Sequence, residues 1–376
     1  SDAAVFPAIN MAMWSFLRKY PVSCVSALLT LFSMVLVPPD STYLEYLDFQ
    51  VLCLLFCLMA VIQGLDSLQM FQRLANWLLK HIHSLRGLYL VLVFLPFVSS
   101  MLLTNDVAHL TFVPFALYLL RLVQAEKHKI FVVVLQTVAA NIGSMLTPIG
   151  NPQNLYLYTE FEWDLLSFLR ITAPPVFLVA ILLLLGSFFL PKQQIHVAPA
   201  APSSFSRLHM IVYVLLFAGC LLTVLRLIPY QLITVLVLLA FLLLARPLLR
   251  KVDYGLLLTF VCFFVFSGNL SRLGGLRDFL ASLMESFPMG VPVWTSQIIS
   301  NVPAALLLSP FTQDPSALLL GVNLGGLGTP IASLASMISL QLYGREKDAR
   351  TGSYLLFFSL VNFGLLLFLM GLSYLL

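Results

Sequence analysis

The sequence predicts an all-α polytopic membrane protein with an inverted-topology repeat, two re-entrant hairpins and two broken transmembrane helices. Composition is the first observation: 60% of the 376 residues are hydrophobic and only 10% are charged, whereas soluble domains carry roughly 25% charged residues. The second observation is that two short polar clusters, each built around an Asn, occur twice in the same order. Paired polar interruptions in corresponding halves of a membrane chain are typical of a transporter's central site.

The repeated clusters keep the same internal spacing in both halves of the chain. The first cluster of each half is an Asn followed at a fixed offset by Pro-Phe: Thr104-Asn105-Asp106 with Pro114-Phe115, and Ser300-Asn301-Val302 with Pro310-Phe311. The second is an Asn followed at a fixed offset by Thr-Pro-Ile: Asn141-Ile142-Gly143 with Thr147-Pro148-Ile149, and Asn323-Leu324-Gly325 with Thr329-Pro330-Ile331. Because unpaired peptide groups in hydrocarbon cost several kcal/mol each, such stretches are not ordinary spans.

Membrane segments follow from a window of about 20 residues per span. In chain order the apolar segments are 20–37, 49–65, 88–120, 131–158, 165–190, 208–228, 230–246, 254–270, 290–311, 316–341 and 352–375. Lys and Arg gather at alternate connections, and Asp and Glu gather at the others. By the positive-inside rule the basic connections are cytoplasmic, which predicts a cytoplasmic N-terminus and a C-terminus outside.

Charge also decides how segment 88–120 is interpreted, because it is basic at both ends and must enter and leave on the cytoplasmic side. Two arrangements fit: two full spans with the turn at the outer surface, or a re-entrant hairpin with a buried tip. We favour the hairpin, because the matching segment 290–311 is too short for two spans. Segments 131–158 and 316–341 each contain the second cluster and are predicted to be broken helices.

The resulting organisation has three parts. Residues 1–190 form the first inverted repeat, 191–229 contain a cytoplasmic linker and a connecting span, and 230–376 form the second repeat. Segments 66–84 and 272–288 precede the two hairpins and are amphipathic at helical spacing. They are interpreted either as interfacial anchors or as levers that carry a moving hairpin.

The polar clusters are predicted to meet near the bilayer centre, where ends of broken helices offer unpaired N–H groups to anions and unpaired carbonyls to cations. The candidate binding residues are Thr104, Asn105, Asp106, Asn141, Thr147, Pro148, Asn151, Asn154, Ser300, Asn301, Asn323, Thr329, Ser333 and Ser336. Oxygen ligands suit a hard cation such as sodium, and the candidate sodium ligands are Asn105, Asp106, Asn141, Asn301 and Asn323. The alternative is that small polar residues only hold helices together; it is strongest for Gly143 and for Gly325-Gly326.

Asp106 is the most distinctive residue, since a carboxylate within the membrane marks an ion or proton path by default. The alternative is that Asp106 caps a helix beginning at Val107. His109, one turn later, is interpreted either as a partner of Asp106 or as a bonded core histidine. Arg272, at the end of a span, is interpreted as an interfacial residue, and the alternative is that it holds the substrate. None of the four clusters contains Lys or Arg, so an anion would be held by dipoles, amides and hydroxyls.

These motifs in order resemble the ion transporter superfamily, which includes sodium-coupled dicarboxylate and citrate transporters, arsenite permeases and D-type sodium/proton antiporters. The resemblance is greatest to a short bacterial branch of anion permeases, and it implies a homodimer with scaffold and transport domains and an elevator-type movement. Thr104-Asn105-Asp106 and Ser300-Asn301-Val302 match the Ser-Asn-Thr hairpin tips of the dicarboxylate branch. Val302 lacks the hydroxyl, and Asp106 is similar to the Asn-Asp of arsenite permeases, whose substrate is uncharged.

The sequence therefore predicts a secondary active transporter of a small anion or neutral oxyacid, coupled to sodium or protons. A sodium/proton antiporter using Asp106 and an arsenite-type efflux permease are the alternatives. An enzyme is not expected, because the chain lacks Gly-x-Gly-Asp and His-Glu-x-x-His motifs. No basic groove favours nucleic acid, and we expect no cofactor other than bound sodium. The expected location is the inner membrane of a bacterium, with lipid, the transported solute and a second copy as partners.

Overall fold

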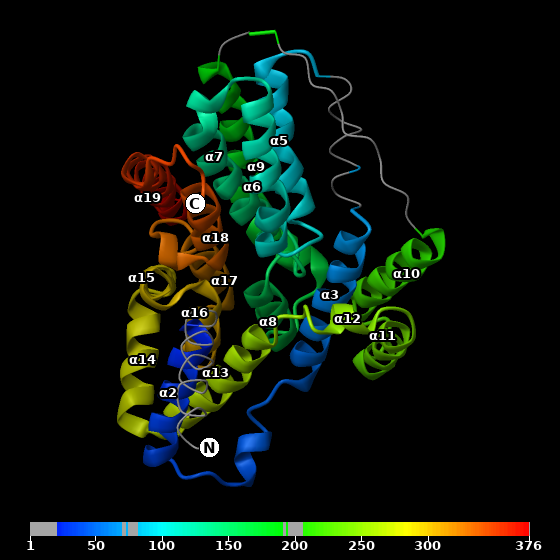
Figure 1. The fold of residues 1–376 in the computed structure, drawn as a ribbon. Helices are drawn as coiled ribbons and strands as arrows, with labels where there is room; N and C mark the ends of the chain where they lie inside the picture. Colours follow the sequence, from blue (N-terminus) through cyan, green and yellow to red (C-terminus); the bar gives the residue numbers. More distant parts are fainter. Residues whose placement is uncertain (1–20, 70–72, 74–81, 191–192, 195–205, 376) are drawn as a thin grey trace, which may run out of the picture.

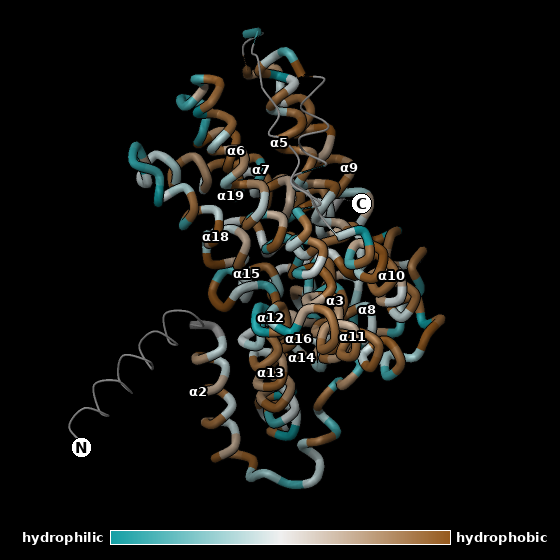
Figure 2. The backbone as a smooth tube through the Cα atoms, turned by 45° about the vertical axis from the view of Figure 1, so that its right-hand side comes forward, coloured by the Kyte–Doolittle hydropathy of each residue, from teal (hydrophilic) through white to brown (hydrophobic). Residues whose placement is uncertain are grey.

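The computed structural model describes residues 21–69, 73, 82–190, 193–194 and 206–375. Over these residues the fold is helical and contains no strand, only an isolated bridge between Ser84 and Gln194. Five helical segments in this part of the chain are long and apolar enough to cross a membrane. Figure 2 shows hydrophobic residues along most helices and hydrophilic residues at the turns between them. The predicted fold class is confirmed.

The first half of the chain folds into helices that follow the predicted segments closely. Their bounds are α2 Pro21–Leu36, α3 Phe49–Ser67, α5 Leu85–Ser99, α6 Asn105–Leu122, α7 Lys129–Ser144, α8 Pro152–Glu160 and α9 Leu165–Gly186. Segment 88–120 is a helix pair, α5 and α6, joined by a short turn, and segment 131–158 is broken between α7 and α8. Most of the amphipathic segment 66–84 and of the linker 191–207 lies outside the described residues.

The second half repeats this order after the connecting helix α10, Arg207–Val224. Its helices are α11 Tyr230–Leu244, α12 Arg246–Leu249, α13 Tyr254–Arg272, α14 Gly274–Ser286, α15 Gly290–Ile299, α16 Asn301–Leu308, α17 Pro315–Leu324, α18 Leu334–Gly344 and α19 Thr351–Leu375. Helices α15 and α16 are the second hairpin, α17 and α18 the second broken helix, and α14 the second amphipathic segment.

Several helices start where an Asp side chain accepts a hydrogen bond from the first turn. Asp48, Asp164, Asp253 and Asp314 cap α3, α9, α13 and α17 in this way. Side-chain caps of this kind satisfy backbone N–H groups that a helix start leaves open. Three of these residues, Asp48, Asp164 and Asp314, lie at acidic connections, which the positive-inside rule predicts on the outer side. Their side chains therefore have a local structural role as well.

The two halves exchange contacts in a matched way. Helix α2 packs against α13 and α11 against α3, while α6 packs against α18 and α16 against α8. Figure 1 shows α5, α6, α7 and α9 in the upper part of the molecule and α2, α13 and α14 in the lower part, with α8, α16 and α17 between them. The helix breaks of the two halves therefore face each other in the middle of the molecule.

A buried amide shows how the fold tolerates proline in an apolar helix. Pro96 lies inside α5 and has no N–H to give to the carbonyl one turn earlier. The carboxamide nitrogen of Gln136 on α7 donates to that carbonyl, Leu92 O, at 2.8 Å, and to Phe112 O on α6 at 3.2 Å. Gln136 thereby joins both arms of the first hairpin to the broken helix beside them.

Candidate functional site at the crossed helix breaks

Each broken helix stops at a short loop and starts again at a new cap. Helix α7 ends at Ser144, and α8 starts after Asn151, whose side chain accepts from Asn154 N at 3.2 Å, with Pro152 in the first turn. Helix α17 ends at Leu324, and the loop that follows contains Gly328 at φ +102°, a left-handed conformation that favours glycine. Both loops contain the predicted Thr-Pro-Ile sequence.

Asn141, near the end of α7, bonds to the start of the other half's second helix. Its amide nitrogen donates to Ser336 Oγ at 3.1 Å, and its oxygen accepts from Ser333 Oγ at 3.1 Å. The same oxygen accepts from the amide nitrogen of Asn105 at 3.2 Å. Asn141 therefore joins the first hairpin tip to α18.

Asn323, near the end of α17, makes the mirrored set of bonds. Its amide nitrogen donates to Asn154 Oδ1 at 2.6 Å, and its oxygen accepts from the amide nitrogen of Asn151 at 3.3 Å. By the fixed offset between the two clusters, Asn151 and Asn154 occupy the positions of Ser333 and Ser336. Each half thus contributes an Asn to the helix start of the other, and the four helix ends form one hydrogen-bonded cluster.

The hairpin tips bond to the same loops. In the first half Asn105 N donates to Gly150 O at 3.2 Å, and the Thr147 hydroxyl donates to Met101 O. In the second half the Thr329 hydroxyl donates to Gln297 O at 3.3 Å, the position that matches Met101. These matched bonds give the repeated Thr a defined role: each Thr ties its loop to its own hairpin.

Ser300 and Asn301 form the second hairpin tip. Ser300 has φ 75°, which is strained for a residue other than glycine, and its hydroxyl donates to Ala332 O at 3.3 Å. Asn301 is buried, and a Cβ atom on Gly326 would lie 2.9 Å from its amide nitrogen. Gly326 therefore leaves room for Asn301 against the break.

Two of the repeated glycines have a packing role. A Cβ atom on Gly143 would collide with Phe97 O and the Ser100 hydroxyl on the first hairpin. One on Gly325 would lie 2.7 Å from Ser296 Oγ, at the matching place on the second hairpin. Close approach of hairpin and broken helix requires glycine at both positions.

Asp106 lies in the first turn of α6 but is not its cap. The helix begins at Asn105, with Thr104 as the N-cap residue and no side-chain cap bond, so the cap alternative is wrong. The Asp106 carboxylate is half-buried and makes no hydrogen bond or ion pair with the residues that the structure describes. His109 is 1% exposed, and its Nδ1 lies 2.6 Å from Asn105 O, so its contact is with the backbone of the tip and not with Asp106.

The structure brings most of the predicted site residues into one hydrogen-bonded cluster. The residues so joined are Asn105, Asn141, Thr147, Asn151, Asn154, Ser300, Asn323, Thr329, Ser333 and Ser336. Asn301 is joined to them as well, because its side-chain oxygen accepts from the Ser300 hydroxyl at 3.4 Å, and it packs against Gly326. Pro148 lies buried in the first loop. Thr104 and Asp106 occupy the first hairpin tip without a bond to the cluster.

Two glutamines at the site were missed by sequence reasoning. Gln297, on α15, places its carboxamide inside the second loop, and its nitrogen donates to Gly325 O at 2.8 Å and Leu327 O at 2.9 Å. Gln153, in the first turn of α8, is 1% exposed, and neither polar atom of its side chain has a partner in the described part of the chain. In the sequence each of them stands out only as a polar residue within an apolar segment. Neither has a polar counterpart in the other half.

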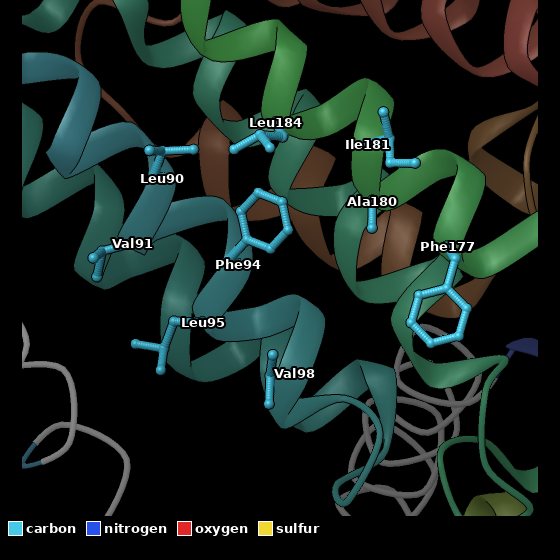
Figure 3. Close-up of a pocket in the computed structure, with 9 residues that line it drawn as sticks. All are labelled: Leu90, Val91, Phe94, Leu95, Val98, Phe177, Ala180, Ile181 and Leu184. Carbon is cyan, nitrogen blue, oxygen red and sulfur yellow. The ribbon is translucent and has the colours of Figure 1, made fainter. Parts of the chain in front are cut away.

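An apolar groove among the described residues lies away from this cluster. Its volume is about 670 Å³, and Figure 3 shows its apolar lining from α5 and α9. The lining residues are Leu90, Val91, Phe94, Leu95, Val98, Phe177, Ala180, Ile181 and Leu184. It carries no polar side chain that could orient a solute, so the polar cluster at the breaks is the better candidate site.

Comparison with known proteins agrees with this geometry. The family model described as "Citrate transporter" matches residues 11–317. The chain is 35% identical over 303 residues to the uncharacterized transporter MJ0456 of Methanocaldococcus jannaschii, covering 80% of this chain and 82% of that protein. It is 30% identical over 308 residues to the inner membrane protein YbiR of Escherichia coli, covering 79% and 80%. A shorter match, 35% identical over 136 residues, covers 35% of this chain and 27% of the silicon efflux transporter LSI3 of Oryza sativa subsp. japonica.

The extent of the family match and of the first two relatives places the chain in the citrate transporter family. Together with its apolar helices, this makes it an integral membrane protein of a transporter family.

Proposed function

We propose that this chain is a secondary active transporter that moves a small oxyacid, anionic or neutral, across the membrane. The observation that carries the proposal is the crossed pair Asn141 and Asn323, which joins the ends of two broken helices and a hairpin tip in one polar cluster. Membrane chains avoid such breaks unless they surround a site for a solute or ion.

The chemistry of the cluster favours an uncharged or weakly charged oxyacid. Its side chains are carboxamides and hydroxyls, which donate to and accept from the oxygens of an oxyacid. Lys and Arg are absent from all four sequence clusters, while Asp106 adds a negative group at the first hairpin tip. A di- or trianion would meet this carboxylate without a compensating cation, so citrate-like solutes fit less well than neutral oxyacids.

An efflux permease of the arsenite type is the second candidate. It is favoured by the partnerless Asp106 at the tip and by the partial match to a protein named as a silicon efflux transporter. Orthosilicic and arsenious acids are both neutral oxyacids near pH 7, so one site chemistry would serve either. A sodium/proton antiporter using Asp106 is a third, and ion exchange without added oxyacid distinguishes it.

The transport mechanism that we propose is an elevator movement in a homodimer in the inner membrane of a bacterium. Hairpins α5–α6 and α15–α16 bond to the broken helices, so these elements would move together as a transport domain. Helices α2, α3, α11 and α13 pack with one another and would form the scaffold. We expect the N-terminus in the cytoplasm and the C-terminus outside, in line with the charges of the connections.

The proposal is tested by uptake into proteoliposomes that contain the purified chain. The panel is silicic acid, arsenite, phosphate, succinate and citrate, and we expect saturable transport of at least one neutral oxyacid. Asn105→Ala and Asn301→Ala should each abolish it in folded protein. Asn362→Ala is the matched control, because Asn362 is fully buried but lies on α19, where it bonds only to its own helix. Normal uptake by both tip variants would show that these amides only pack helices.

A further inference from the structure

The loops that break the two helices contain backbone carbonyl oxygens, the kind of ligand that would hold a sodium ion. Carbonyl oxygens at a helix C-terminus carry partial negative charge, and oxygen ligands suit hard cations. The sequence predicts that transport is coupled to sodium or to protons. Whether sodium can bind depends on which donors these carbonyls already accept hydrogen bonds from.

In the first break the carbonyls converge on Asn154. Its amide nitrogen lies 3.2 Å from Met145 O, 3.2 Å from Thr147 O and 3.4 Å from Ser144 O. Asn154 is fully buried, and its oxygen is held by Asn323. The donor at the centre of this carbonyl group is therefore a fixed part of the protein.

In the second break the carbonyls converge on Gln297. Its amide nitrogen donates to Gly325 O and Leu327 O, and its oxygen accepts from Thr329 N at 2.8 Å. Gly328 wraps closely around the same carboxamide: a Cβ there would overlap Gln297 Oε1. The loop is therefore shaped around this side chain.

Other carbonyls of the two loops are also occupied. Gly150 O accepts from Asn105 N, and Leu146 O accepts from the Thr172 hydroxyl at 3.4 Å. Ala332 O accepts from the Ser300 hydroxyl, and Thr329 O from Ala332 N at 3.1 Å. A cation bound at these carbonyls would compete with the internal donors that already use them.

We infer that the carboxamides of Asn154 and Gln297 occupy the positions that a sodium ion would take in the two breaks, and that transport by this chain is independent of sodium. A carboxamide NH2 presents hydrogens to the carbonyls and cannot share them with a cation. The two halves achieve this with different elements, since Asn154 comes from the second half-helix of its own break and Gln297 from a hairpin arm. The inference rests on the proposed function and leaves Asp106 and His109 as the ionisable groups at the hairpin tips.

Thermal melting of the purified chain in detergent tests the inference with sodium alone as the probe. The melting temperature is measured in sodium, potassium and choline chloride at equal ionic strength. We expect the same value in all three salts at every concentration. A rise with sodium that potassium and choline do not reproduce overturns the inference, because a ligand that binds the folded state raises its stability.

Gln297→Glu shows whether the second break can hold a cation once its donor is removed. The exchange keeps the shape and replaces the donor nitrogen with an oxygen, so the variant should melt lower than wild type and recover specifically in sodium. Gln231→Glu on the exposed face of α11 makes the same exchange outside the site and should show no sodium effect. If Gln297→Glu folds and also ignores sodium, Gln297 is not displacing a cation and the inference fails. If the variant does not fold, the wild-type comparison decides.

Proteoliposome uptake separates this inference from the proposed function. Equal rates of oxyacid uptake in sodium and potassium support both, and uptake that requires sodium refutes the inference but not the function. If no oxyacid is transported in either salt, the proposed function fails, and the melting comparison still decides the inference.

Discussion

The two helix breaks are built on one plan but carry different chemistry. Asn141 and Asn323 make matching bonds across the molecule, and Thr147 and Thr329 make matching bonds to their hairpins. Around this shared frame the first half has two further amides at the start of α8, where the second half has Ser333 and Ser336 at the start of α18. The positions that match are the ones that hold the four helix ends together.

The hairpin tips differ most. Asp106 and His109 in the first half correspond by the fixed offset to Val302 and Ala305 in the second. The ionisable groups are therefore on one side of a nearly symmetric frame. We infer from this asymmetry that the repeated residues form the site and that the ionisable groups of the first tip make transport depend on pH.

The largest effect is expected from breaking the shared frame. Asn141→Ala and Asn323→Ala each remove three hydrogen bonds in a buried site and leave partners unpaired at about 1–3 kcal/mol each. We expect transport to be abolished and stability to fall by about 3–5 kcal/mol in both variants, measured by proteoliposome uptake and by melting in detergent. A large loss in one variant and none in the other would show that the two halves are not equivalent.

The second effect separates the two tips. Asp106→Asn keeps the size of the side chain and removes its charge, so transport should lose its pH dependence while the melting temperature changes little. Val302→Asn, the matched change in the second half, adds an amide without altering charge and should leave the pH profile as in wild type. Flux measured over a pH series decides, and an unaltered profile in Asp106→Asn would remove this carboxylate from coupling.

The repeated residues were the part of the site that the sequence could predict. Duplication at fixed spacing identified both hairpins, both breaks and the Asn pair, because a symmetric frame repeats its sequence. The crossing was not predictable: which Asn bonds to which Ser depends on how α6 and α18, or α8 and α16, lie in space. Asp106 as a cap was wrong because α6 begins at Asn105, two residues earlier than the Val107 start that a cap at Asp106 requires.

Gln153 and Gln297 show the limit of the same reasoning. Neither has a polar counterpart in the other half, since Ala335 and Met101 stand at the matching positions. Gln297 bonds to a loop, whereas Gln153 has no partner among the described residues. In the sequence both are a single Gln in an apolar segment, so the sequence cannot tell these two cases apart. Only the loop conformation around Gly328 and the burial of α8 distinguish these roles.

Gln153 provides the third test, because a buried amide without partners is costly to the fold. Gln153→Leu removes that cost and should raise stability by about 1–3 kcal/mol, measured as a higher melting temperature. If the unpaired amide is kept for a solute, the same variant should transport poorly. Gln153→Ala, which copies the second half, should resemble it in transport. Full activity in both would mean that the first half gains no binding group from this residue.

The smallest effect concerns how the two broken helices start. Helix α17 is capped by Asp314, whereas α7 has no side-chain cap and instead begins with Lys129, a buried ammonium 2.9 Å from Glu346 and 3.0 Å from Asp348. The hydrogen bond from Lys129 holds the pKa of Asp348 below its ordinary value of 3.8. A carboxyl whose pKa is lowered by folding stabilises the protein above its unfolded pKa and loses that contribution as the pH falls through the folded value.

Asp348→Asn should therefore melt slightly below wild type at neutral pH, and the difference should disappear at a pH below the lowered pKa. Because Asp348 is 54% exposed, the loss should be under about 1 kcal/mol. Added salt should reduce it further, since an exposed pair is screened. Asp314→Asn is the matched change at the start of α17 and should have almost no effect, because Asn caps about as well as Asp. A larger loss in Asp314→Asn than in Asp348→Asn would mean that α17, and not α7, depends on a charge at its start.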